Sequence, residues 1–557
     1  MVRQEIVKQY IASLKEDGEL DYIFPLLLER MEYRILSTPK QSKGMPQYGR
    51  DVVATKKVDG VDTLFLFELK GFRAHDITDR SLTEPDGIMD SLKASKNTKY
   101  RDASIPGLSQ FPRKYVFVHN GGLEANAQLT WNDFVQEWFP EGNLERWDLL
   151  KLTALFSEYL FDETLLADEE SYHLFKKVLV MLDGEGNNYK DIVTLIDLQL
   201  KKLGTSKKGN KRITYNLFAT LRLIASMVYQ YSKEADNLLP AKFCIDTILL
   251  KTWAWILKEK KEKRKTITDH YYSLVLLQVQ IYEEYVNKVL SIARLDKGLY
   301  GFESTDTEYV FYPLRCFDFL GDLVYFYFMT ECIGRPTKKE IQNRVGALEV
   351  LIKKNSACSV PLLDTHSIVI QMISLYLYTR SNGEDDIQSL GKYLIDIVFN
   401  LTKRYQKQSM WPEMTGNRLA LARSLYEKDD DYCCDSSLLI MVIFELIAYL
   451  NIPDLYEPFK KIVEESGVNL QVAYPMTEEY DIEQLLFEHR LYEEMAVQTD
   501  IKLPDTLDDF HKYYMKKYSS MKYRTDAVGF EFLRMLAHKY YETDLFPDFL
   551  GRAYCRE

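Results

Sequence analysis

The spacing of hydrophobic residues changes at about residue 145 of this 557-residue chain. Before that point, segments whose apolar residues recur every three or four positions alternate with short runs rich in β-branched and aromatic residues. In chain order, the predicted elements are helices over residues 3–17 and 20–33, a strand pair over 52–58 and 61–69, a helix over 91–102 and a strand over 114–120. This order is typical of a compact α/β domain, which we place at residues 1–144.

Beyond that domain the strand signals nearly vanish. Long stretches rich in Leu, Ile, Tyr and Phe keep the helical spacing, and no fixed-period repeat accompanies them. We therefore expect a large all-α region over residues 145–557. The breaks within it have loop composition and lie at residues 201–212, 379–386 and 427–437, and the first of them is where the region could be subdivided.

The strand pair of the first domain carries a strong turn signal. Asp59 and Gly60 stand between two β-rich runs, and both residue types tolerate the positive φ angles of a two-residue hairpin loop. If these two residues form the loop, Lys57 faces Asp62 across the strands, which is a favourable pairing of opposite charges. The turn therefore predicts the register of the whole hairpin.

The same register places two carboxylates opposite each other at the far end of the hairpin. Asp51 faces Glu68, with β-carbons roughly 5 Å apart, and like charges in this position destabilise a sheet. A divalent cation such as Mg²⁺ or Mn²⁺ would reverse that effect, because oxygen-rich sites suit these ions. Lys70 lies two residues beyond Glu68 and so shares its face of the strand. The run between residues 61 and 69 is apolar on both faces and predicts a central, buried strand.

The segments "YGRDVVA" and "LFLFELKG" resemble the D...E-x-K signature of the PD-(D/E)XK, or restriction endonuclease-like, nuclease superfamily, and most resemble its Mrr-like branch. The upstream segment "PLLLERMEYRILSTPK" is similar to the helix that precedes the site in that branch, and "YVFVHNGGLEANAQ" resembles the later strand and helix. Arg50 stands where the family often has proline. The resemblance covers residues 5 to 140 and implies a mixed central sheet flanked by helices.

The resemblance also implies metal-dependent hydrolysis of phosphodiester bonds. Asp51, Glu68 and the backbone carbonyl of Leu69 would hold one or two Mg²⁺ or Mn²⁺ ions, and Glu29 matches a position that can join the metal shell. The ions would polarise the phosphate and lower the pKa of an attacking water. Lys70 would orient that water or stabilise the developing negative charge. The catalytic set expected from the resemblance is thus Asp51, Glu68 and Lys70.

Basic residues near this site suggest a surface for nucleic acid. Lys93, Lys96 and Lys99 recur at helical spacing, Arg101 follows, and Arg50 adds positive charge beside Asp51. Such a row could track a phosphate backbone without reading sequence, although a solvated helix face explains the same spacing. His119, near a strand end, could contact substrate, but a structural hydrogen bond is the commoner role of such a histidine.

Composition limits the remaining choices. The net charge is −12, yet residues 1–140 hold 19 basic and 20 acidic side chains, so the acidity lies in the helical region. The seven cysteines have no C-x-x-C spacing, and the first residues lack the apolar core of a secretory signal, which favours a reducing, cytoplasmic compartment. The most apolar run, residues 438–450, is interrupted by Glu445 and is too short to span a membrane. We expect it to be a buried helix.

The leading hypothesis is a Mg²⁺-dependent endonuclease that acts on DNA rather than RNA, as an effector of a prokaryotic antiviral defence or restriction system. The helical region would then sense a trigger, bind a protein partner or assemble a homo-oligomer, a role that rests on analogy of architecture. Two alternatives stay open. One is a catalytically silent nucleic-acid-binding module, and the other is a helical interaction scaffold with a structural N-terminal domain.

Overall fold

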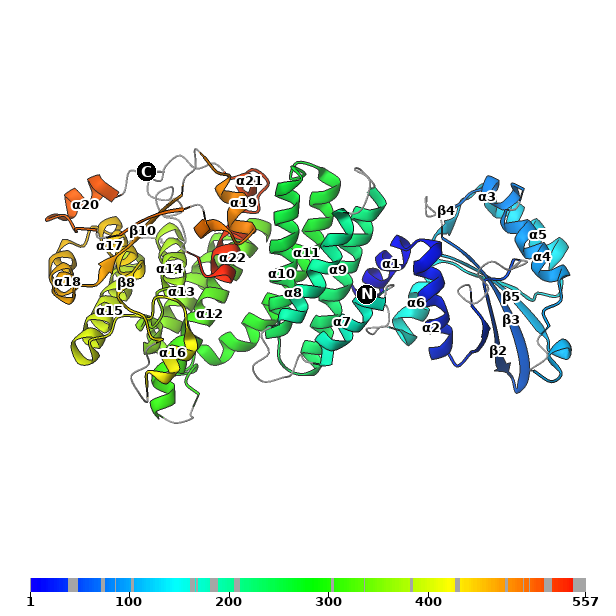
Figure 1. Cartoon of the computed structure of the whole chain (residues 1–557), viewed down its shortest axis with the longest axis horizontal. Helices are drawn as coiled ribbons and strands as arrows, with labels where there is room; N and C mark the ends of the chain where they lie inside the picture. The colour runs from blue at the N-terminus through cyan, green and yellow to red at the C-terminus, as the bar shows by residue number, and fades with distance from the viewer. Residues whose placement is uncertain are drawn as a thin grey trace. The chain divides into compact units, whose positions relative to one another are not determined.

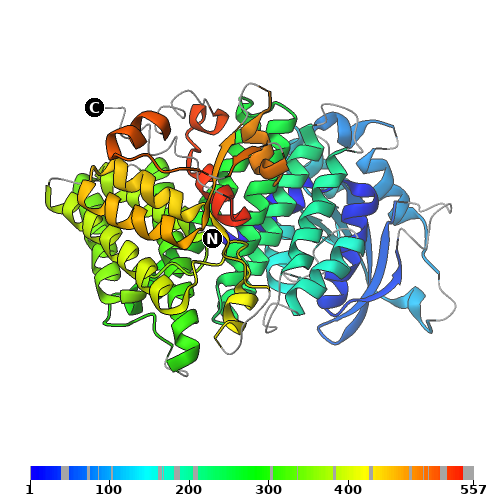
Figure 2. The same ribbon diagram turned by 60° about the vertical axis from the view of Figure 1, so that its left-hand side comes forward.

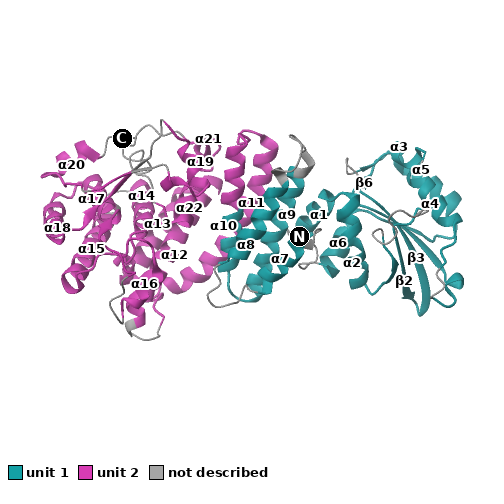
Figure 3. Ribbon diagram, viewed as in Figure 1, with its two compact units in different colours: residues 1–248 teal, residues 249–557 magenta. Residues whose placement is uncertain are grey.

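The structure is a computed structural model, and the chain in it divides into two compact units, Met1–Ile248 and Leu249–Glu557 (Figure 3). Each unit is described by itself. The structure describes residues 2–543 except 39–48, 72–75, 86, 102–104, 161–165, 167–168, 181–188, 205–210, 302–304, 335, 381–383, 426–430, 476–478, 494, 500 and 515–522. The expected subdivision near residues 201–212 therefore falls largely outside the described residues.

The first unit contains a five-stranded mixed sheet in the order β1-β2-β3-β5-β7. Strands β1, β2 and β3 pair antiparallel, whereas β3, β5 and β7 pair parallel. The strands are β1 (Arg34–Ser37), β2 (Val52–Val58), β3 (Val61–Lys70), β5 (Arg113–His119) and β7 (Leu144–Trp147). This confirms a mixed sheet built on the predicted hairpin.

Helices cover both faces of this sheet (Figure 1). On one face, inward residues such as Leu66 and Phe117 pack into a core with α3 (Asp79–Thr83), α4 (Ile88–Asn97) and α5 (Ala127–Trp138). On the other face, Phe67 meets Phe24 of α2 (Asp21–Arg30), with ring centroids 5.3 Å apart. Strand β3 is buried continuously from Thr63 to Leu69 and lies at the middle of the sheet, as its apolar pattern predicts.

The expected domain boundary at residues 144/145 is not a boundary of the fold. It would cut through β7, a strand that the sequence did not predict. Helix α1 (Val2–Ser13) also packs on both α6 (Leu149–Tyr159) and α9 (Lys211–Glu234). Arg222 of α9 donates a hydrogen bond of 2.7 Å from Nη1 to Oε1 of Gln9. These contacts join the sheet and the helices α7 (Glu169–Val180), α8 (Lys190–Gly204) and α9 into one unit.

The second unit is mostly helical. Its longest helices are α11 (Lys265–Ala293), α12 (Thr305–Gly334), α13 (Lys338–Lys354), α14 (His366–Arg380) and α15 (Glu384–Gln408). Coloured green to yellow, they pack side by side in both views (Figures 1 and 2). The run at 438–450 forms the buried helix α17 (Leu439–Tyr449), as expected. None of the helices in the described ranges combines the length and the apolar character needed to cross a bilayer.

The region beyond residue 145 is nevertheless not all-α. Strand β10 (Val472–Pro475) pairs antiparallel with β11 (Met495–Gln498), and β8 (Ser436–Ser437) pairs parallel with β9 (Asn469–Leu470). These strands have only two to four residues each, which is too short for an alternating hydrophobic pattern to reveal them. The expectation of a helical region therefore holds for the architecture but not for every segment.

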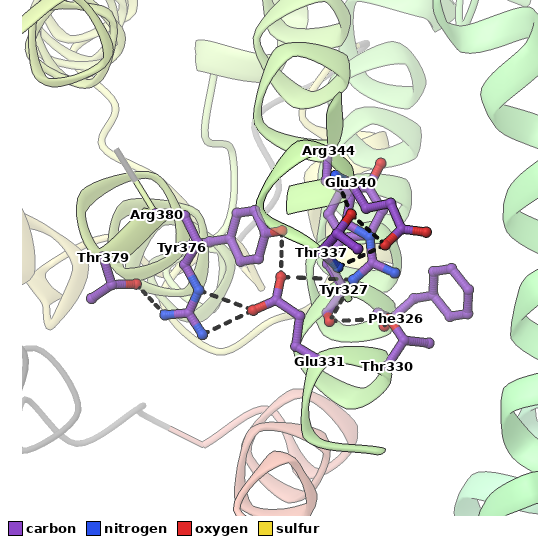
Figure 4. Close-up of polar contacts among 10 residues, drawn as sticks. All are labelled: Phe326, Tyr327, Thr330, Glu331, Thr337, Glu340, Arg344, Tyr376, Thr379 and Arg380. Carbon is purple, nitrogen blue, oxygen red and sulfur yellow. Dashed lines mark hydrogen bonds and ion pairs between the residues drawn. The ribbon is translucent and has the colours of Figure 1, made fainter. Parts of the chain in front are cut away.

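A partly buried polar cluster, which we call the Glu331 cluster, links three helices of this unit (Figure 4). Glu331 of α12 accepts hydrogen bonds from the hydroxyl of Tyr376 at 2.6 Å and from Nε of Arg380 at 3.0 Å, both on α14. Arg344 of α13 places Nη1 3.7 Å from the same carboxylate and donates to the carbonyl of Tyr327 at 3.3 Å. One carboxylate thus holds two guanidinium groups and a phenol.

Candidate functional site

The hairpin forms with the predicted register. Asp59 and Gly60 adopt φ angles of 50° and 82°, the left-handed pair that a two-residue turn needs, and Lys57 faces Asp62. The strands pair as far as Val52 and Phe67. One residue earlier, the N–H of Asp51 donates at 2.8 Å to the carbonyl of Phe67, which is already the partner of Val52. The predicted register therefore ends at Val52, and the strands do not pair Asp51 directly with Glu68.

The three predicted catalytic side chains come together at this end of the hairpin. The negative charge of Glu68 is close enough to raise the pKa of Asp51, and Nζ of Lys70 lies 3.1 Å from Oε1 of Glu68. Oδ2 of Asp51 accepts a hydrogen bond of 2.7 Å from the N–H of Leu69. The Glu68 carboxylate also hydrogen-bonds the side chain of Ser91, which places it under α4.

The pKa shifts at this site are those expected for two carboxylates that lie close together. Burial and the negative charge of Glu68 together raise the pKa of Asp51 to about 7, although the hydrogen bond from Leu69 opposes the change. Burial also raises the pKa of Glu68, although Lys70 opposes that change. For Lys70, burial alone would lower the pKa, but Glu68, Glu16 and Asp51 together raise it above its ordinary value. The Lys70 ammonium therefore stays charged. Its single positive charge does not balance the three carboxylates around it, those of Glu16, Asp51 and Glu68.

Glu16 is a fourth member of the site that sequence reasoning missed. Its Oε1 lies 3.4 Å from Nζ of Lys70, and its Oε2 accepts a hydrogen bond of 3.1 Å from the N–H of Gly71. Glu16 opens a short π-helical turn, Glu16–Leu20, between α1 and α2. The only signal in the sequence is the polar break "KEDGE" between two amphipathic helices, which predicts a turn but not its target.

Gly71 permits this approach. A β-carbon at that position would lie 2.4 Å from the backbone nitrogen of Glu16, a distance that side chains do not tolerate. The glycine that ends the "ELKG" segment therefore lets the turn before α2 come against the end of β3. We refer to Glu16, Asp51, Glu68 and Lys70 as the four-residue site.

The structure does not bring Glu29 to this site. Helix α2 starts beside the site at Asp21 and runs toward the opposite end of the hairpin, so Glu29 lies exposed in its last turn. The carbonyl of Met31 accepts a hydrogen bond of 2.8 Å from Nζ of Lys56. Lys56 is five residues along β2 from Asp51, or about 16 Å at strand spacing. The carboxylate that joins Glu68 in contacting Lys70 belongs to Glu16, in the turn that precedes the same helix.

The donor set suits a hard divalent cation. Two neighbouring carboxylates, Asp51 and Glu68, and the backbone carbonyl of Leu69 are oxygen ligands of the type that Mg²⁺ and Mn²⁺ prefer. In the described ranges, no group of three or more His, Cys, Asp or Glu side chains is arranged to hold a metal ion. A metal at this place would therefore rest on Asp51 and Glu68, with the backbone, water or substrate completing its shell.

The expected row of basic residues does not form. Helix α4 ends two residues before Lys99, so Lys99 and Arg101 lie beyond it in an exposed segment. Nζ of Lys93 lies 5.1 Å from the ring centroid of Trp138, and Lys96 donates a hydrogen bond to the carbonyl of Trp138. Those two lysines pack at the end of α5, where their charges meet the negative end of a helix.

Arg50 and His119 are both buried. The guanidinium of Arg50 lies 5.8 Å from the ring centroid of Tyr100, and its residue is only 7% exposed. His119 stacks on Phe117 with centroids 5.1 Å apart, and burial lowers its pKa to about 3. A neutral, buried imidazole supports the structural interpretation of His119 over contact with a substrate.

Comparison with known proteins adds no relative. No protein family, no curated protein and no solved structure matches this chain.

Proposed function

We propose that the protein is a metal-dependent endonuclease that hydrolyses phosphodiester bonds of DNA. The observation that carries this proposal is the close approach of partly buried Asp51 to buried Glu68 at the end of a central strand, with Nζ of Lys70 3.1 Å from Oε1 of Glu68. Like charges buried in this way destabilise a fold unless a bound cation compensates them. Lysine next to such a pair supplies the positive charge that a reacting phosphate needs.

The residues divide the work as follows. Asp51 and Glu68 would hold Mg²⁺ or Mn²⁺, which polarises the phosphate and lowers the pKa of an attacking water when bound. Because the pKa of Asp51 is about 7, metal binding at neutral pH has to displace only a weakly held proton. Lys70 keeps its charge and can orient the water or stabilise the phosphorane. Glu16 fixes the position of the Lys70 ammonium through the 3.4 Å contact.

Two exposed basic residues remain candidates for the substrate backbone. Lys99 and Arg101 flank Tyr100, whose ring lies against Arg50, the neighbour of Asp51 in the chain. They therefore flank a residue that contacts the segment carrying Asp51. As in the sequence-based hypothesis, we propose DNA rather than RNA as substrate and a role as effector in antiviral defence or restriction, with the helical part serving as sensor or assembly module.

The contacts of Lys70 favour one second candidate. Its ammonium is shared by Glu68 and Glu16, so the charge meant for a phosphate is already matched inside the protein. A catalytically silent module that only binds nucleic acid is compatible with that arrangement.

Cleavage assays separate the two candidates. Supercoiled plasmid DNA and a single-stranded RNA are incubated with the full chain in Mg²⁺, in Mn²⁺ and in EDTA. We expect metal-dependent cutting of DNA, reduced about a hundredfold or more in Asp51→Ala and Lys70→Ala. Asp62→Ala, an exposed carboxylate at the other end of the same hairpin, is the matched control. Binding of DNA without cutting in either metal would favour the silent module. Equal cutting by wild type and Asp51→Ala would refute the site.

A further inference from the structure

The second unit contains a half-open cavity that the proposed nuclease chemistry does not use. Its volume is about 370 Å³, within the range of pockets that hold small organic ligands. It lies where the start of α14, the start of α17, strand β11 and the end of α22 (Phe532–Tyr541) meet. The residues that line it are Asp364, Thr365, Met414, Thr415, Leu438, Gln471, Tyr492, Val497, Tyr541 and Glu542.

The charge of this lining is one-sided. Among the described residues that line the cavity, Asp364 and Glu542 are carboxylates and none is Lys, Arg or His. Asp364 is buried and fixed, because its carboxylate accepts hydrogen bonds from the N–H groups of Leu438 at 2.8 Å and Leu439 at 3.2 Å. It caps the N-terminus of α17 and forms a rigid wall of the cavity.

Glu542 supplies the charge that a ligand can reach. It follows the last residue of α22 in the left-handed conformation, with φ of 52°, and its residue is exposed. A β-carbon on Gly416 would lie 3.0 Å from Oε2 of Glu542, so the glycine leaves room for this carboxylate. Partial burial raises the pKa of Glu542 above its ordinary value.

Two cations, Arg418 and Lys539, act on the Glu542 carboxylate and lower its pKa, and each of them is also matched by another acid. Arg418 binds both carboxylate oxygens of Asp318, at 2.6 and 2.8 Å, and Lys539 binds Asp322 at 2.5 Å. These four side chains form two neutral pairs. The negative charge of Glu542 is therefore in excess at the mouth of the cavity.

The rest of the lining suits the carbon skeleton of a small molecule. Met414, Leu438 and Val497 are apolar, and Tyr492 and Tyr541 add aromatic surface. Tyr541 is held in place, because its hydroxyl donates to the carbonyl of Phe487 at 3.2 Å and its ring stacks on His489 at 4.5 Å. Aromatic rings beside a carboxylate are the usual environment of bound organic cations.

We propose that this cavity binds a small organic cation, a molecule with a protonated amine or guanidinium group that pairs with Glu542 and an apolar part that packs on Met414, Val497 and the tyrosines. Anionic ligands such as nucleotides are disfavoured, because both charged groups of the lining are carboxylates. This inference does not depend on the nuclease proposal.

Calorimetric titration of the full chain tests it with three probes, putrescine, agmatine and tyramine, and with AMP as the anionic comparison. We expect at least one cation to bind and AMP not to bind. Glu542→Gln should weaken the cation about tenfold or more, since a charge-assisted hydrogen bond is lost. Val497→Trp, at a residue 43% exposed, should fill the cavity and abolish binding.

The control is Glu465→Gln, an exposed acid on α18 (Pro453–Ser466) that should leave the affinity unchanged. Circular dichroism checks that each variant is folded. If Val497→Trp does not fold, the result for Glu542→Gln decides the test. The proposal is overturned if none of the three cations binds at millimolar concentration, if AMP binds more tightly than they do, or if Glu542→Gln binds as wild type does.

Discussion

Two partly buried polar clusters of this chain are built with opposite balances of charge. In the Glu331 cluster, one carboxylate is shared by Arg344, Arg380 and the hydroxyl of Tyr376 (Figure 4). In the four-residue site, three carboxylates share a single ammonium, that of Lys70. An acid surrounded by donors is satisfied by the fold itself. A group of acids with one cation is complete only when another cation arrives, so excess negative charge distinguishes a binding site from a structural link.

The largest expected effect is on stability. Glu331→Gln leaves two guanidinium groups without their carboxylate and should lower the free energy of unfolding of its unit by about 3 kcal/mol. Glu68→Gln should cost less than about 1 kcal/mol, because Lys70 keeps Glu16 and the repulsion with Asp51 disappears. Urea unfolding measures both changes, and hydrogen exchange in α12 and β3 assigns each to its unit.

Glu465→Gln, at an exposed pair on α18, is the control and should stay within about 0.5 kcal/mol of wild type. If Glu331→Gln and Glu68→Gln lower the free energy of unfolding equally, both clusters stabilise the fold to the same extent. The proposed difference between a structural cluster and a binding site would then be wrong.

A smaller effect separates Glu16 from Glu29. Glu16→Gln weakens the contact that positions Lys70 and should lower the rate of DNA cleavage about tenfold, with little change in substrate KM. Glu29→Gln alters an exposed carboxylate at the far end of α2 and should cut as wild type does. Cleavage rates in Mg²⁺ measure both. A loss in Glu29→Gln with normal activity in Glu16→Gln would restore Glu29 as the site residue.

The smallest effect is a dependence of stability on pH. The pKa of Asp51 is about 7 when folded against an ordinary value of 3.8, so the folded chain holds a proton that the unfolded chain releases. Its contribution to stability is therefore lost as pH rises from about 4 to about 7. Asp51→Asn should remove this slope and be more stable than wild type at pH 8.

Thermal unfolding in EDTA across this pH range provides the measurement. Added Mg²⁺ should raise the melting temperature of wild type but not of Asp51→Asn. If the stability of Asp51→Asn falls with pH as steeply as that of wild type, the charge of Asp51 does not destabilise the metal-free protein, and this prediction is wrong.

The parts of the site that could be predicted are those fixed by local chemistry. The turn at Asp59 and Gly60 sets the pairing of neighbouring strands, so the approach of Asp51 to Glu68 followed from a few adjacent residues. Alternation along β3 then placed Lys70 on the same face. The apolar pattern of β3 likewise predicted its central position in the sheet.

The parts that were missed depend on contacts between distant segments. Glu16 and Lys70 are 54 residues apart, and only the direction of α2 decides which end of that helix meets the site. The lysine spacing in α4 was read as a continuous helix, but Thr98 is extended and ends it. Strand β7 has four residues and pairs with a strand far before it in sequence, so no local pattern marked it. Each error arose where tertiary packing overrides a local signal.

Helix α1 makes it difficult to separate the sheet of the first unit from the helices that follow it in the chain. It packs on α6 and α9, its Ser13 carbonyl accepts a hydrogen bond from Asn216, and the turn that follows it carries Glu16 to Lys70. A fragment of residues 1–144 would therefore expose the apolar side of α1 and lose the support of the turn. The smallest piece expected to keep the four-residue site intact reaches at least to the end of α9, at Glu234.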